Sequence, residues 1–478
     1  MHTETQSQNG DRLIRVLAVT LVITVMSATM FNIVLPEIAA EFRLTLSQAS
    51  WVSSGFLLVY AIGTVIYGKL ADRFKLKNVM TFGIFFFAFG SLIGLTADSY
   101  GALLAGRILQ AAGAAVIPAS ASIIPVRYYP QEKRGRALGI TMTGLAIGAA
   151  IGPGVAALAV GFLHWRWLFL MPMLTLLVLP YFRRYLKDER GKPGRMDWLG
   201  GTLLAGAVAL LLLAITYDSW PSAAGCAAAF GLFALRIRSA KEPFVKPALF
   251  GSKGYALGLA LAFLTTGVGY ALPFLSPQLL AEVNRLDSAW IGYVMVPAAA
   301  ASALLGRKGG RLADSKGSPF LFFAASALLL ACFLLMSSFA GAAPAWIAGF
   351  LIFGNVGQSF MLIALNHSVS RTMSQEQVGV GMGLMAMLNF MAGAVSASVY
   401  GKLIDRGSGA SWNPVQETPE AFVFSNLYLA LAAVHVVILA LFYVQFGRGG
   451  RRMRESGASS PAHSKATERM NRYEGNHR

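Results

Sequence analysis

The chain has few charged residues for its length. Only 13% of its 478 residues are Asp, Glu, Lys or Arg, whereas a soluble globular protein carries about a quarter. Hydrophobic residues make up 55% of the sequence and the mean hydropathy is +0.58, which excludes a soluble globular fold. The two cysteines, Cys226 and Cys332, both lie in apolar stretches, so they predict neither a disulfide framework nor a metal motif.

Catalytic signatures are also missing. The sequence holds no cluster of His, Asp, Glu or Cys at one membrane face and no phosphate-binding loop. Asp and Glu are absent from the middle of every long apolar stretch. We therefore expect no enzyme, no catalytic residue, no metal site and no cofactor.

What the chain has instead is a series of long apolar runs. A helix needs about 20 mostly apolar residues to cross a bilayer, and about fourteen stretches qualify, although the sixth and eighth are short. The predicted spans are Val16–Ile38, Ala49–Tyr67, Val79–Leu95, Ala102–Val126, Ala137–Leu163, Trp167–Phe182, Trp198–Tyr217, Ala223–Leu235, Tyr255–Leu280, Trp290–Leu305, Leu321–Ser338, Trp346–Leu365, Val378–Tyr400 and Phe422–Phe446. The sequence thus predicts an all-α integral membrane protein.

The formal net charge of +18 is better explained by membrane topology than by binding to nucleic acid. Basic residues gather in alternate connections between spans, at 183–195, 236–253 and after 447, while the other connections hold few. Cytoplasmic loops carry such an excess of Lys and Arg. We expect a multi-pass protein of the cell membrane with both termini in the cytoplasm and no nucleic-acid binding.

A short cluster is repeated far along the chain. Gly68–Asp72 reads Gly-Lys-Leu-Ala-Asp after span two, and Gly310–Asp314 reads Gly-Arg-Leu-Ala-Asp after span ten. An offset of eight spans predicts two related six-helix halves with two extra spans between them, the plan of a transporter whose site lies between its halves. A weaker echo, Gly401–Arg406, follows span thirteen, and coincidence explains it equally well.

This plan gives four predicted regions. An N-terminal six-helix bundle occupies 1–182, two linker spans with basic loops occupy 183–253, a C-terminal six-helix bundle occupies 254–446, and a disordered basic tail occupies 447–478. We expect a monomer.

The repeated cluster is a candidate conformational latch, formed by Gly68, Asp72, Arg73, Gly310 and Asp314. Gly68 would permit close helix contact, and Asp72 can pair with a helix N-terminus or an arginine. Such a charged turn can hold two helices together in one conformation and release them in another. The alternative is an ordinary loop that only sets topology.

Polar side chains within spans are the candidate coupling and substrate residues. A charge at mid-bilayer costs about 2.5–3.5 kcal/mol on insertion scales, so Arg107, with Gln110 one turn on, should face the bundle interior. The alternative for Arg107 is a structural bond to backbone carbonyls. Asn32 and Gln358 could line a cavity for an amphipathic ligand, although helix-to-helix hydrogen bonding is the default for each.

Span five has a glycine face that ends in a proline. Gly144, Gly148 and Gly152 are four residues apart, which gives a flat packing face, and Pro153 removes a backbone hydrogen bond and permits a kink. A bendable, closely packed helix is useful where an opening must close.

These residues resemble the major facilitator superfamily, in particular its fourteen-span drug/proton antiporters. Gly68–Lys77 is similar to the motif Gly-x-x-x-Asp-Arg-x-Gly-Arg-Arg, and Leu104–Ala115 is similar to Arg-x-x-Gln-Gly-x-Gly, with Ala111 in place of a glycine. Gly148–Pro153 is similar to the antiporter motif Gly-x-x-x-Gly-Pro. The fourteen-span tetracycline efflux proteins give the strongest overall resemblance.

The resemblance implies a major facilitator fold and a secondary active efflux transporter, which exports amphipathic drugs, cationic or tetracycline-like, in exchange for protons. Its partners would be a small-molecule substrate, protons and the lipid bilayer. The acids of the family's coupling positions are replaced here by Ser27, Ala149 and Gly393. Asp72, Asp314 and His435 are the remaining titratable candidates, with peripheral packing as the alternative for His435. Other open functions are export of an endogenous metabolite or peptide product and a transport-inactive membrane sensor.

Overall fold

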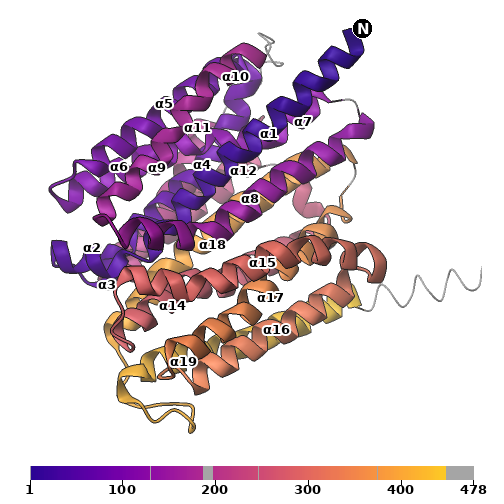
Figure 1. Cartoon of the computed structure of the whole chain (residues 1–478). Coiled ribbons are helices and arrows are strands. Elements are labelled where there is room, and N and C mark those ends of the chain that lie inside the picture. The colour runs from indigo at the N-terminus through magenta and orange to yellow at the C-terminus, as the bar shows by residue number, and fades with distance from the viewer. Residues whose placement is uncertain (1, 130, 187–196, 246, 374, 448–478) are drawn as a thin grey trace, which may run out of the picture.

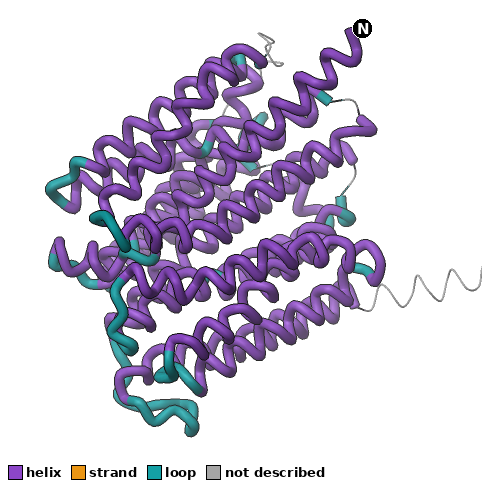
Figure 2. The backbone as a smooth tube through the Cα atoms, viewed as in Figure 1, coloured by secondary structure: helices purple, strands orange, loops and turns teal. Residues whose placement is uncertain are grey.

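The computed structural model describes residues 2–129, 131–186, 197–245, 247–373 and 375–447. Helices account for almost all of this part of the chain, and short connections gather at both ends of the bundle (Figure 2). In lipid a backbone must satisfy its own hydrogen bonds, and a long helix does so without a partner strand. The all-α prediction is therefore confirmed for the described residues.

The first group of helices comprises α1–α10. Its bounds are α1 (His2–Thr29), η1 (Met30–Asn32), α2 (Leu35–Phe42), α3 (Leu46–Ala49), α4 (Trp51–Arg73), α5 (Leu76–Leu95), α6 (Tyr100–Ala114), α7 (Val116–Tyr128), α8 (Gln131–Val160), η2 (Trp165–Phe169), α9 (Leu170–Met173), η3 (Leu174–Val178) and α10 (Leu179–Tyr185). We call the end of the bundle where α1 begins the near face, and the end that holds the α2–α3 connection the far face.

The second group comprises α13–α19, and the hairpin α11–α12 stands between the two groups in sequence. The bounds are α11 (Trp198–Tyr217), α12 (Trp220–Ser239), η4 (Pro247–Gly251), α13 (Lys253–Gly269), α14 (Ala271–Glu282), α15 (Ser288–Lys316), α16 (Ser318–Ser338), α17 (Pro344–Ser370), α18 (Gln375–Arg406), η5 (Pro419–Ala421), α19 (Phe422–Phe442) and η6 (Tyr443–Gly447). Figure 1 shows the two groups lying on opposite sides of the molecule.

Thirteen helical segments of the described chain are long and apolar enough to cross a membrane. They match thirteen of the predicted spans; the segment that is left is α8, whose apolar stretch, Ile147–Val160, is shorter. The sixth and eighth spans are longer than predicted, at Trp165–Tyr185 and Trp220–Ser239. The arrangement with fourteen spans and the four domain boundaries stay predictions, and the tail at 448–478 lies outside the described residues.

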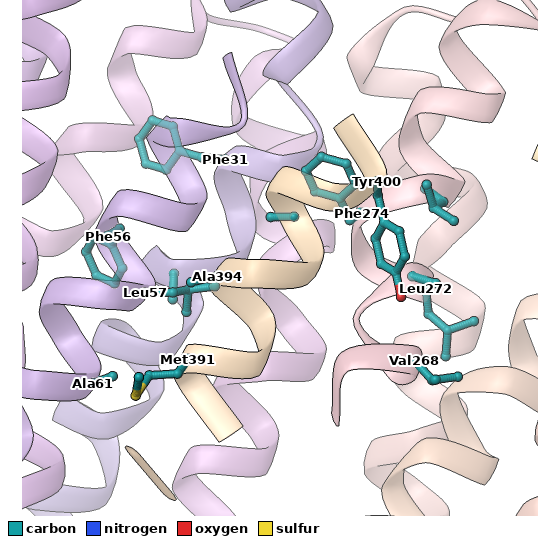
Figure 3. Packing of buried hydrophobic residues seen from close by; sticks show 14 of the residues in the cluster. Phe31, Phe56, Leu57, Ala61, Val268, Leu272, Phe274, Met391, Ala394 and Tyr400 are labelled. Atoms are coloured by element: carbon teal, nitrogen blue, oxygen red, sulfur yellow. The ribbon is translucent and has the colours of Figure 1, made fainter. Parts of the chain in front are cut away.

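Two pairs of long helices form the largest contacts between the groups. α4 packs against α18, and α8 packs against α15. Figure 3 shows Leu57 beside Ala394 and Ala61 beside Met391, with Leu272 and Tyr400 on the other side of α18. One hydrophobic cluster therefore continues from one group into the other, and a second cluster lies within the first group.

Glycine sets the spacing of the tightest pair within the first group. A Cβ added at Gly90 of α5 would lie 2.3 Å from the backbone nitrogen of Gln110, and one added at Gly113 of α6 would lie 2.2 Å from the backbone nitrogen of Phe87. Lipid supplies no hydrophobic force between helices, so the close packing of the two backbones holds α5 and α6 together instead. It also fixes the position of α6, which carries Arg107.

Asp197 anchors the start of the α11–α12 hairpin. Its carboxylate accepts hydrogen bonds from the backbone of Gly200 at 3.1 Å and of Phe244 at 3.2 Å, and from Nε of Arg236 at 3.0 Å. Burial alone would raise the pKa of Asp197, but these hydrogen bonds and the charge of Arg236 outweigh it, so the pKa lies below its ordinary value. The carboxylate ties both ends of the hairpin to the connection that follows.

We expect Asp197→Ala to destabilise the protein by about 1 kcal/mol at neutral pH, the usual loss for a helix cap. Because the folded-state pKa is depressed, this stabilisation is present above the unfolded pKa of about 4 and is lost as pH falls through the folded value. Thermal unfolding in detergent should therefore separate the variant from the parent at pH 7 and bring them together in acid. Asp98→Ala, at an exposed acid, is the control.

Candidate functional site

Arg107 lies fully buried in the first group and binds the backbones of two other helices. Its Nε donates to the carbonyl oxygen of Val52 on α4 at 3.0 Å. Both Nη atoms donate to the carbonyl oxygen of Ser27 on α1 at 3.3 Å. The guanidinium therefore holds α1, α4 and α6 together, which is the geometry of the structural alternative for this residue.

Gln110 extends this network to α5. Its Oε1 accepts from Nη1 of Arg107, and its Nε2 donates to Oγ of Ser91 at 2.7 Å. The hydroxyl of Ser91 in turn donates to the carbonyl oxygen of Phe87 at 2.7 Å. The prediction that Arg107 and Gln110 face the bundle interior is confirmed, whereas their role in coupling stays a prediction.

Two aromatic rings enclose the guanidinium of Arg107. Its Cζ atom lies 4.2 Å from the ring centroids of both Phe31 and Phe56. Cation–π contacts of this kind stabilise a desolvated cation. Among the residues that the structure describes, no carboxylate pairs with Arg107, so a positive charge stands in the middle of the bundle without a counter-ion.

Asn32 is the junction between the two groups. Its Oδ1 accepts from Oγ of Ser53 at 2.6 Å, and its Nδ2 donates to the hydroxyl of Tyr270 at 3.2 Å. Its carbonyl oxygen accepts from Nε2 of Gln278 at 3.0 Å. Both partners from the second group lie in its first span, at or after the break between α13 and α14, and Asn32 itself lies at the break that ends α1.

Gln358 of α17 reaches the same region. A Cβ added at Gly269 would lie 2.2 Å from Oε1 of Gln358, so this side chain packs onto the residue before Tyr270. Oε1 of Gln358 and Oε1 of Gln278 are buried, and neither accepts a hydrogen bond within the described chain. Asn32 and Gln358 are thus both brought to the break at Tyr270, while Arg107 lies against the ring of Phe31.

The structure describes only part of the repeated cluster. The side chain of Asp72 lies outside the described residues, and the side chains of Arg73 and Asp314 are exposed. Gly68 does not make the close helix contact that was predicted for it, because a Cβ there would meet nothing within 4 Å, and the same is true of Gly310. Gly309, the residue before the second cluster, makes a close contact instead, since a Cβ added there would lie 2.6 Å from Cδ1 of Phe360. The close contact predicted at Gly68 is therefore wrong, and the latch itself stays a prediction.

The glycine face of α8 packs against α1. A Cβ added at Gly144 or Gly148 would lie 2.6 Å from the carbonyl oxygen of Ala18 or Val22, and one at Gly152 would lie 2.1 Å from Oγ1 of Thr29. Pro153 is buried within the helix. The flat packing face is confirmed; its part in transport stays a prediction.

His435 lies fully buried in α19, where its ring faces Phe333 at 6.4 Å between centroids. Neither ring nitrogen has a hydrogen-bond partner in the described part of the chain. α19 packs on α16 and α13. This is the packed, peripheral position that the sequence left open as the alternative.

Sequence reasoning missed two contacts between the groups at the far face. Asp405 of α18 binds the start of α3, and Gly292 of α15 packs on Ala157 of α8. The echo of the repeated cluster at Gly401–Arg406 was the available signal for Asp405. For Gly292 the sequence offers only one glycine among 50.

Membrane-crossing helices in two groups, joined by a buried polar junction, define a multi-pass membrane transporter. A model described as Major Facilitator Superfamily matches residues 17–397, and the chain belongs to that superfamily of transporters, whose members are not enzymes. The protein is thus a secondary transporter with a small-molecule substrate.

Known proteins resemble the chain over most of its length. It is 24% identical over 443 residues to the riboflavin transporter RibZ of Clostridioides difficile strain 630, covering 90% of this chain and 96% of the relative. It is 25% identical over 377 residues to Multidrug resistance protein 3 of Bacillus subtilis strain 168, covering 75% and 73%. The crystal structure of the nucleoside transporter NupG superposes with a TM-score of 0.62 at 13% identity, covering 90% of this chain and 99% of that one, which shows the shared fold.

Proposed function

We propose that this transporter is an efflux antiporter, which exports amphipathic drugs, with tetracycline-like molecules as candidates, in exchange for protons. The observation that carries the proposal is the junction at Asn32 and Tyr270, where polar groups from both groups of helices meet beside buried aromatic rings. The motif resemblance to fourteen-span drug/proton antiporters and the similarity to Multidrug resistance protein 3 support it.

The two groups would alternate access by rocking about this junction. With both termini in the cytoplasm, the near face is cytoplasmic and the far face is external. Asn32 donates a hydrogen bond to the hydroxyl of Tyr270 and accepts one from Gln278. Ser288 donates to the carbonyl oxygen of Ile33, and these bonds join the groups toward the far face. This conformation would therefore receive substrate from the cytoplasm, with Asp72 and Asp314 as candidate latches at the near face.

The buried charge of Arg107 favours neutral or anionic amphipathic substrates over cationic ones. At an effective dielectric constant of about 20, two unit charges about 8 Å apart interact with about 2 kcal/mol, roughly a thirty-fold effect on binding. A site at the junction would meet this field without an acid to offset it. The buried acceptors Oε1 of Gln278 and Oε1 of Gln358 offer partners for hydroxyl or amide groups of such a ligand.

We expect Gln110→Glu to weaken the preference for neutral or anionic substrates over cationic ones. A carboxylate in place of the carboxamide that binds Arg107 would neutralise the buried cation, so a cationic substrate should gain affinity by about ten-fold or more relative to its neutral analogue. Competition binding of a neutral and a cationic analogue of one scaffold measures the ratio. An unchanged ratio in Gln110→Glu would show that Arg107 does not set the charge preference.

The second candidate function is export of an endogenous metabolite. The similarity to a protein named riboflavin transporter favours it, because that relative covers nearly the whole chain. A flavin-like molecule is amphipathic and aromatic, so it suits the same junction.

Reconstitution into proteoliposomes tests the proposal. With an acidic lumen, proton efflux should drive accumulation of a neutral amphipathic drug in the lumen, and a proton ionophore should abolish it. Riboflavin accumulation without drug transport would favour the metabolite exporter. Binding of either ligand with no transport under any gradient would favour a transport-inactive sensor and overturn the antiporter.

A further inference from the structure

The end of α18 docks onto the beginning of α3. Oδ1 of Asp405 accepts a hydrogen bond from the backbone nitrogen of Leu46 at 2.8 Å, and Oδ2 accepts one from the backbone nitrogen of Ser47 at 2.8 Å. α3 continues into α4 as a single membrane-crossing segment, Leu46–Ala71. A carboxylate of the second group thus satisfies backbone donors at the start of a helix of the first group, where negative charge is stabilised.

A glycine one helical turn earlier makes this approach possible. A Cβ added at Gly401 would lie 3.0 Å from Cα of Ser47 and 3.2 Å from the carbonyl oxygen of Leu46. The sequence Gly-Lys-Leu-x-Asp-Arg ends both α4, at Gly68–Arg73, and α18, at Gly401–Arg406, and these helices pack together. Only the copy on α18 has its glycine in contact, so in this conformation the far end of the pair is the docked end.

The basic residues next to Asp405 in the sequence form ion pairs with another acid. Nζ of Lys402 lies 2.6 Å from Oδ2 of Asp218, and Nη2 of Arg406 lies 2.7 Å from Oδ1 of the same residue, at the tip of the α11–α12 hairpin. Nζ of Lys402 also donates to the carbonyl oxygen of Thr216 at 3.1 Å. Glu282 at the end of α14 repels Asp405, and Arg285 partly offsets the charge of Glu282. The backbone nitrogens of α3 are therefore the strongest partners of Asp405.

We propose that Asp405 is the far-face latch of this transporter: its carboxylate holds the start of α3 and must release it before the far face opens. The proposal rests on the alternating-access mechanism proposed above and adds the residue that controls one of its gates. Charged hydrogen bonds to backbone donors are the strong ones, so losing the pair should raise the ratio of open to closed far face about ten-fold or more.

Distances between spin labels test the latch without substrate or a proton gradient. Asp98→Cys, in the α5–α6 connection, and Ala410→Cys, in the α18–α19 connection, are exposed far-face sites on the two groups. They are labelled in a chain whose buried Cys226 and Cys332 are replaced by serine. Double electron–electron resonance in nanodiscs should give one short distance in the parent. Asp405→Asn should add a longer distance, with the expected ten-fold rise in the ratio of open to closed far face.

Asp287→Asn is the matched control. Asp287 also caps a far-face helix, accepting from the backbone nitrogen of Trp290 at 2.9 Å, but both residues belong to the second group. Asp287→Asn should leave the distances unchanged, whereas Gly401→Ala, which keeps the carboxylate and pushes α18 off α3, should add the long distance. The latch is refuted if Asp405→Asn keeps the parent distances, or if Asp287→Asn opens the far face equally. A preparation that transports neither drug nor riboflavin but still opens in Asp405→Asn would retain the latch and remove the antiporter.

Discussion

Arg107→Ala is expected to abolish transport and to lower the stability of the protein. The guanidinium bridges the carbonyl oxygens of Val52 and Ser27 and the carboxamide of Gln110, between two phenylalanine rings. Removing it leaves buried acceptors without their donor and a cavity among α1, α4 and α6. We expect a loss of about 2–4 kcal/mol in the free energy of unfolding.

Arg107→Lys separates the role of the charge from the role of the shape. Lysine keeps the positive charge but cannot donate to three acceptors in the planar fork that this site uses, nor stack flat between two rings. Thermal unfolding in detergent should place Arg107→Lys between the parent and Arg107→Ala, while proteoliposome transport should fall at least ten-fold in both. Transport at the parent rate in Arg107→Ala would remove Arg107 from the mechanism and leave the fold intact.

The positions of the spans could be predicted because lipid imposes a length. About 20 apolar residues are needed to cross, and few other features of a sequence produce such runs. The ends of the helices differ from the predicted span ends where polar residues continue a helix beyond its apolar stretch. Thus α12 begins at Trp220 and ends at Ser239, whereas the apolar stretch covers only Ala223–Leu235.

The direction in which each helix faces could not be predicted in the same way. A membrane helix is apolar both toward lipid and toward its neighbours, so its hydrophobic pattern does not tell which side is buried. For this reason the sequence did not indicate that Gly309, and not Gly310 of the repeated cluster, packs on Phe360. Polar residues were more informative, because Arg107 and Asn32 had to face the interior.

Contacts between segments far apart in sequence were out of reach from one sequence. Asp405 and Ser47 are separated by 358 positions, and Asn32 and Tyr270 by 238. The echo at Gly401–Arg406 marked a helix end but did not name its partner. Which polar residues meet at the junction became clear only from the fold.

Gly292→Ala is the second substitution with a large expected effect. A Cβ at Gly292 would lie 1.7 Å from Cβ of Ala157, whereas carbon atoms in contact stay about 3.5–4.0 Å apart. α8 and α15 would have to separate by about 2 Å toward the far face, and overpacking of this kind costs about 1–3 kcal/mol. In the proposed alternating-access mechanism only the closed far face needs this contact, so the variant should populate the open far face and transport at least ten-fold more slowly.

The double variant Gly292→Ala with Ala157→Gly tests whether the cause is steric. It moves the methyl group from α8 to α15 and restores one Cβ to the contact, so spin-label distances and transport should return toward the parent values. Gly161, just after the end of α8, gives the control. A Cβ there would lie 3.2 Å from Cβ of Ala289 on α15, so Gly161→Ala should have a milder effect. If the double variant stays as impaired as Gly292→Ala, the methyl overlap is not the cause, and the α8–α15 contact does not close the far face.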